Sequence, residues 1–71
     1  MERFGEKLRV LRERRGMSQR ELGKALGFSS SAYVHFLETG QRKPNVALLI
    51  KLSALFEVTM DQLAKDHLDV E

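Results

Sequence analysis

Residues 18–38 decide the fold, and they read SQRELGKALGFSSSAYVHFLE. Ser18 and Glu21 have the spacing of a capping box, in which a hydroxyl and a carboxylate satisfy the first free N–H groups of a helix. This helix is expected to stop at Gly27, because glycine readily takes the left-handed conformation that closes helices. The serine run at 29–31 then offers N-caps for a second helix that continues to about residue 38.

Helical spacing of apolar residues continues on both sides of this stretch. Residues 4–15 predict a first amphipathic helix, Asn45 can cap a fourth, and a second capping box begins a fifth at Thr59. No segment shows the period-two alternation of a strand. The sequence therefore predicts an all-α fold of five short helices around one core. We expect this domain to span residues 1–66 and residues 67–71 to form a frayed tail.

Composition excludes several classes of protein. The chain has no cysteine and two unclustered histidines, so we expect no disulfide, no metal site and no cofactor. No apolar run reaches the roughly 20 residues of a membrane span, and the charged start has no signal-peptide character. We therefore expect a cytoplasmic protein without a membrane partner. No nucleophile–base pair or carboxylate dyad is visible, so neither an enzyme nor a small-molecule substrate is expected.

Charge is unevenly distributed along the chain. Residues 1–43 hold ten Lys and Arg against five Asp and Glu, whereas residues 44–71 hold two against five. A basic half attracts a polyanion such as nucleic acid. An uneven solvated surface would give the same count, so charge alone leaves both interpretations open.

Two helices joined by a tight turn at Gly27 follow the helix-turn-helix plan, in which the second helix enters the DNA major groove. Val34 and Leu37 are expected to dock this helix on the scaffold, which leaves its other faces free. Tyr33 and Phe36 have two open interpretations, contact with DNA or packing on the scaffold. The predicted base-reading residues are Ser30, Ser31, Ala32, His35 and Phe36. The predicted phosphate-binding residues are Gln19, Tyr33, Arg42 and Lys43.

At this point the chain resembles the phage repressor and Cro-like helix-turn-helix family. The similarity covers about residues 4–65 and rests on several short motifs in a fixed order. They are FGEKLR at 4–9, RGMSQ at 15–19, LGKALG at 22–27, LETGQRKP at 37–44 and VTMDQL at 58–63. The resemblance implies a lambda-repressor-like DNA-binding domain from a bacterium or phage, associated with the nucleoid.

The resemblance also implies individual roles. Arg12 and Glu38 match a largely buried ion pair between the first and third helices. Gln19 matches a phosphate-binding position. Thr39, Arg42 and Lys43 match a phosphate-binding loop, which adds Thr39 to the predicted phosphate-binding residues. The chain departs from the family by one extra residue in the serine run, which can shift the base-reading register by one. It also has Glu57 where a glycine usually ends the fourth helix.

The second half of the chain is more apolar than a lone domain of this size needs. An ordinary core explains this, and so does a dimer interface. The candidates for that interface are Leu48, Leu55, Phe56, Leu68 and Val70. The interpretation favoured by the sequence is a transcriptional regulator, a repressor that binds a palindromic operator as a homodimer. The alternative is an antitoxin or adaptor module whose apolar far face binds a partner protein.

Overall fold

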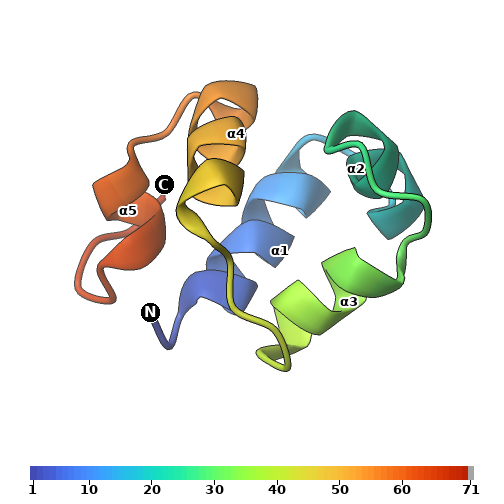
Figure 1. Cartoon of the computed structure of the whole chain (residues 1–71). Coiled ribbons are helices and arrows are strands. Elements are labelled where there is room, and N and C mark those ends of the chain that lie inside the picture. Colours follow the sequence, from blue (N-terminus) through green and yellow to red (C-terminus); the bar gives the residue numbers. More distant parts are fainter. Residues whose placement is uncertain (71) are drawn as a thin grey trace.

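A computed structural model describes residues 1–70, and this part of the chain folds into five helices without a strand (Figure 1). The all-α prediction is confirmed. The elements are α1 (Phe4–Arg14), α2 (Gln19–Ala25), α3 (Ala32–Thr39), α4 (Val46–Phe56) and α5 (Met60–Ala64). In Figure 1, α1 runs between the α2–α3 pair and the α4–α5 pair. It packs on α3 and on α5.

Local capping sets where three of the helices begin. The Ser18 hydroxyl accepts the Glu21 N–H at 3.0 Å, and the Glu21 carboxylate accepts the Ser18 N–H at 2.9 Å. Thr59 and Gln62 form the same reciprocal pair at the start of α5. Asn45 caps α4 through its side-chain oxygen at 2.8 Å. Since each cap satisfies N–H groups that lack partners within the helix, these starts follow from a few adjacent residues.

A residue from the other end of the chain caps α1. Asp66 accepts the backbone N–H of Arg3 at 3.0 Å through one carboxylate oxygen and that of Glu2 at 3.1 Å through the other. These two bonds lower the pKa of Asp66, because they stabilise the charged carboxylate. The start of α1 is thereby joined to the segment that follows α5.

Residues 67–70 do not extend into solvent as a frayed tail. Val70 is 8% exposed and belongs to the core. Arg3 on the α1 side donates to Asp69 at 2.9 Å, and Arg14 donates to the Val70 carbonyl at 3.4 Å. The expected tail is therefore corrected over 67–70, since basic groups of α1 and its cap hold the segment down. Glu71 lies outside the described residues, and the division of the chain at residue 66 stays a prediction.

One lysine belongs to the interior. Lys7 is 1% exposed, and its ammonium donates to the carbonyls of Gln62 at 2.7 Å and Lys65 at 2.6 Å. These carbonyls lie at the end of α5, where backbone acceptors lack helical partners. The charge is thus compensated by the negative end of a helix. The apolar core around it consists of Phe4, Leu8, Leu11, Leu22, Leu26, Val34, Leu37, Leu48, Leu49, Leu52, Phe56, Leu63 and Val70.

The crossing of α1 over α3 requires a residue without a side chain. A Cβ added at Gly5 would lie 2.4 Å from the Glu38 carbonyl oxygen and 2.7 Å from that of Leu37. Both neighbours are backbone atoms, so neither can move aside alone. Gly5 therefore sets how closely α3 approaches α1, and with it the position of α3 on the surface of the molecule.

Glu57 ends α4 in a left-handed conformation, with φ 56° and ψ 43°. It is the only non-glycine residue with positive φ in the described part of the chain. The turn closes through the Val58 N–H, which donates to the Ser53 carbonyl at 3.2 Å. A residue with a Cβ is strained in this conformation, which is why helices commonly end in glycine there.

Candidate nucleic-acid interface

The α3 helix has one buried side and one free side. Val34 and Leu37 are fully buried and pack it on the scaffold. Ala32, His35 and Thr39 on the other side are exposed. At about 3.6 residues per turn these positions share one face of the helix. A helix with this division can enter a major groove about 12 Å wide without losing its attachment.

The turn before α3 accommodates the extra serine. Gly27 follows α2 with φ 84°, and α3 begins only at Ala32. Ser30 and Ser31 consequently lie in the turn and not on the helix. The Ser30 hydroxyl accepts the Ala32 N–H at 3.3 Å, and Ser31 occupies the N-cap without a side-chain bond. The longer turn, rather than an earlier helix start, therefore absorbs the insertion.

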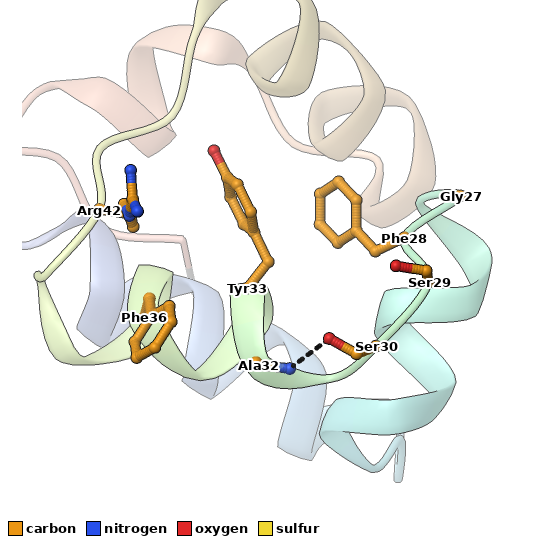
Figure 2. Close-up of a pocket in the computed structure, with 8 residues that line it drawn as sticks. All are labelled: Gly27, Phe28, Ser29, Ser30, Ala32, Tyr33, Phe36 and Arg42. Carbon is orange, nitrogen blue, oxygen red and sulfur yellow. Dashed lines mark hydrogen bonds between the residues drawn. The ribbon is translucent and has the colours of Figure 1, made fainter.

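The structure divides the predicted base-reading residues into groups. Ser30, Ala32 and Phe36 line one open groove beside α3, shown in Figure 2. His35 borders a separate hollow on the opposite flank of α3, together with Gln19. Ser31 lines neither hollow and is half-buried. Whether each of these residues contacts a base stays a prediction.

Gln19, the first residue of α2, is held in place by the third helix. Its amide nitrogen donates to the Glu38 carboxylate at 3.1 Å. An amide carries a second N–H as well as an oxygen, so this bond orients the group without using all of its capacity. The residue also stands at the positive end of a helix dipole. These features suit contact with a phosphate.

The loop after α3 carries the other predicted phosphate ligands. Gly40 closes the helix in the left-handed conformation, and the Phe36 carbonyl then accepts the N–H groups of Gln41 at 2.9 Å and Arg42 at 3.1 Å. The side chains of Arg42 and Lys43 are exposed. The backbone is thus fixed while the two cations remain available to an anion.

Tyr33 lies at the edge of the groove. It is 36% exposed, and its ring stacks on Phe28 with centroids 4.7 Å apart and planes tilted by 33°. In Figure 2 the Tyr33 side chain extends away from α3 between Phe28 and Arg42. The Tyr33 ring therefore packs on the scaffold, and its hydroxyl end remains accessible. Thr39, the last predicted ligand, is exposed and donates to the Phe36 carbonyl at 3.4 Å.

The ion pair between Arg12 and Glu38 is present and nearly enclosed. Arg12 Nε lies 2.6 Å from Glu38 Oε2, and Arg12 Nη2 lies 3.1 Å from Oε1. The Glu38 side chain is 4% exposed and that of Arg12 is 12% exposed. Hydrogen bonding to Glu38 raises the pKa of Arg12, so the guanidinium stays charged. One carboxylate therefore connects α1, α3 and, through Gln19, the start of α2.

Three of the five residues expected at a dimer interface lie inside this chain's own core. Leu48 and Phe56 are each 6% exposed, and Val70 is 8% exposed. The Arg15 guanidinium also covers the Phe56 ring at 5.4 Å from its centroid. Leu55 and Leu68, the other two candidates, are half-buried. The interface assignment is corrected for Leu48, Phe56 and Val70, because these side chains are already buried in the core of this chain, and it stays a prediction for Leu55 and Leu68.

Different apolar residues face solvent on α4. Val46 is 65% exposed and Ile50 is 53% exposed. Their separation of four residues places them on the same face of the helix. The sequence alone does not separate the apolar residues of α4 that face outward from those that face inward. The reason is that α4 itself carries apolar residues on nearly every side.

Sequence reasoning also missed Phe28, Lys7 and Gly5. Phe28 sits in a turn, where no periodicity reports its direction. The signal for Gly5 was its place in a motif shared with a known family, four residues after the start of the chain. Among residues 1–70 there is no cluster of three His, Cys, Asp or Glu side chains arranged to bind a metal ion. Within the same residues no helix is both long and apolar enough to traverse a lipid bilayer.

Comparison with known proteins agrees with this geometry. Residues 8–63 match the model of a helix-turn-helix family. The chain is 40% identical over 62 residues to the HTH-type transcriptional regulator PrpR of Mycobacterium tuberculosis. The matched region covers 87% of this chain and 13% of PrpR. The chain is 36% identical over 62 residues to the SPbeta prophage-derived uncharacterized HTH-type transcriptional regulator YonR of Bacillus subtilis, covering 87% and 56%.

A solved structure gives the same result for the fold. The crystal structure of a transcriptional regulator from Listeria innocua has a TM-score of 0.78 and 27% identity to this chain, covering 84% of this chain and 55% of that one. This chain thus spans about half, or less, of the length of the relatives it matches. The family match and the helix-turn-helix geometry establish that the chain belongs to the phage repressor and Cro-like helix-turn-helix family, a class of DNA-binding domains that are not enzymes.

Proposed function

We propose that this chain binds a palindromic DNA operator as a homodimer and represses transcription, with α3 in the major groove of each half-site. The observation that carries the proposal is the division of α3 into a fully buried side and an exposed one. Three relatives are named as transcriptional regulators, which supports a regulatory role. We place the protein at the nucleoid of a bacterial cell, as its bacterial relatives suggest.

The size of α3 argues for two copies on the DNA. Its eight residues span about 12 Å, which reaches only a few base pairs of a duplex. A second copy one helical turn away, at about 34 Å, would double the sequence that is read. A bound dimer would also cover enough DNA to exclude other proteins from a promoter. Repression by occlusion is the mechanism we propose.

We propose the exposed pair Val46 and Ile50 as the dimer surface. It replaces the buried candidates Leu48, Phe56 and Val70. A two-fold contact places the same patch of each copy against itself, so one apolar face suffices. The rival interpretation, an antitoxin or adaptor with an apolar far face, relied on the same five candidates as the dimer. Because three of them, Leu48, Phe56 and Val70, are in the core, they are not available to a partner protein.

Selection of bound duplexes from a random pool tests the proposal. We expect an inverted repeat whose half-site centres are one helical turn apart. The double variant Val46→Glu/Ile50→Glu should sediment as a monomer and bind the selected site much more weakly than the wild type. The control is Ala25→Glu, which adds one negative charge, against two in the double variant, at an exposed position on α2. A selected site without symmetry, or a wild type that sediments as a monomer on its operator, would overturn the dimer.

Phosphate contacts need a separate test. Lys43→Ala should weaken binding to selected and random DNA by the same factor. The slope of log affinity against log salt concentration should become shallower by about one. Equal slopes in the wild type and the variant would remove Lys43 from the phosphate-binding residues.

A further inference from the structure

The groove beside α3 has an apolar centre. Its volume is about 580 Å³, and it is open to solvent along its length. Ala32 and Phe36 lie one helical turn apart on its α3 wall, and Phe28 and Tyr33 line it from the turn and the helix edge (Figure 2). Arg42, from the loop after α3, lines the groove at the end opposite the serines.

Groups that can form hydrogen bonds lie at the two ends of this groove and at the tip of the Tyr33 side chain. Ser29 and Ser30 lie at the end formed by the turn, and Arg42 lies at the end formed by the loop. The side chains of Ala32 and Phe36 between them contain no donor or acceptor. A base edge opposite Ala32 and Phe36 can therefore be recognised by these two side chains only through contact between apolar groups.

The apolar wall is also held in a fixed position. The Phe36 carbonyl accepts two N–H groups of the following loop, which ties down the end of α3. Tyr33 is stacked on Phe28 at 4.7 Å. A surface that is ordered before binding loses little conformational freedom when a ligand arrives.

The major-groove edges of the bases offer one apolar group, the methyl on C5 of thymine. Cytosine has a hydrogen at C5, and 5-methylcytosine has the same methyl as thymine. We propose that Phe36, supported by Ala32, reads a C5 methyl in each half-site, and that thymine supplies it. This inference rests on the proposed function, because it requires α3 to lie in the major groove.

Replacement of thymine by deoxyuridine tests the proposal, since it removes only the methyl. In the operator selected from a random pool, each thymine of one half-site is replaced in turn, and the dissociation constant is measured at fixed salt. At one position the wild type should bind about four-fold more weakly, the effect expected when one buried methyl-sized group is lost. At the same position, 5-methylcytosine should bind about four-fold more tightly than cytosine.

Variants assign the contact to its residue. Phe36→Gln should bind the thymine and deoxyuridine operators equally well, and Phe36→Leu should keep part of the difference. Phe36 lies outside the apolar core, so both variants should fold, which a thermal melt checks. Arg42→Ala is the matched control from the same groove. It should weaken binding to both operators by one common factor and leave their ratio unchanged.

The outcomes separate this inference from the proposed function. If the wild type selects no preferred sequence, the proposed function fails. If it selects a site but tolerates deoxyuridine at every position, only the methyl contact is overturned. A deoxyuridine effect that persists in Phe36→Gln would overturn the assignment to Phe36. A four-fold loss that disappears in that variant would support the proposal.

Discussion

Replacing Glu38 by alanine should destabilise the protein more than any change of a single exposed charge. The Glu38 carboxylate accepts three hydrogen bonds, from Arg12 Nε at 2.6 Å, Arg12 Nη2 at 3.1 Å and the Gln19 amide at 3.1 Å. Glu38→Ala removes both acceptor oxygens and with them all three hydrogen bonds. The Arg12 guanidinium would then stay largely enclosed, with its bond to the Met17 carbonyl at 2.8 Å as compensation.

The size of the loss follows from this geometry. Removing one partner of a buried ion pair costs about 3–5 kcal/mol, because the other charge is left without compensation. Arg12 is 12% exposed and keeps one carbonyl partner, which places the expected loss near the lower figure. At about 4–8 °C per kcal/mol for a domain of this size, the midpoint of thermal unfolding should fall by at least about 12 °C.

Circular dichroism melts at neutral pH measure this midpoint. The control is the double variant Arg12→Leu/Glu38→Met, which replaces both charges by apolar groups of similar length. It should recover most of the lost stability, because no buried charge remains. A Glu38→Ala midpoint within about 3 °C of the wild type would refute the argument. So would a double variant no more stable than Glu38→Ala.

Three further changes test the scaffold by thermal or acid unfolding. Gly5→Ala should lower stability by about 1–3 kcal/mol, because its Cβ would meet backbone oxygens. The control Gly23→Ala, whose added Cβ has its nearest contact at 3.2 Å, should be close to neutral. Equal melting points of the two variants would contradict this. Glu57→Gly should raise stability by roughly 0.5–1 kcal/mol by relieving left-handed strain, and Glu57→Ala should bring no gain. The lowered pKa of Asp66 means that its stabilising contribution is present above about pH 4 and is lost as the pH falls through the folded-state value. Asp66→Asn should therefore unfold less steeply in acid than the wild type, and superimposable acid titrations would exclude the effect.

The features that could be predicted from sequence depend on neighbouring residues. The capping boxes at Ser18 and Thr59 and the cap at Asn45 each involve groups within three residues of one another, so their spacing is visible in the chain. The docking residues Val34 and Leu37 were predicted for the same reason, since helical periodicity places them on one side. Local chemistry therefore determined where α2, α4 and α5 begin and which side of α3 is free.

The features that could not be predicted depend on segments far apart in the sequence. Asp66 caps a helix more than sixty residues earlier, and the ammonium of Lys7 meets carbonyls of α5. No motif records these contacts, because they exist only once α1 and α5 are packed together. The exposure of Ile50 was missed for a related reason. An apolar helix has no pattern that tells its inner face from its outer one, and only the neighbouring helices decide which is which.

Stability and the proposed base recognition reside in different side chains of the same short helix. Val34, Leu37 and Glu38 attach α3 to the scaffold, whereas Ala32 and Phe36 contribute little to the core. A substitution at Phe36 can therefore change which base is preferred while the fold survives. A substitution at Glu38 must disturb both properties, since its carboxylate also holds the Gln19 amide at the start of α2. Variants with altered operators should consequently arise at Phe36, and changes at Glu38 should weaken binding to every sequence alike.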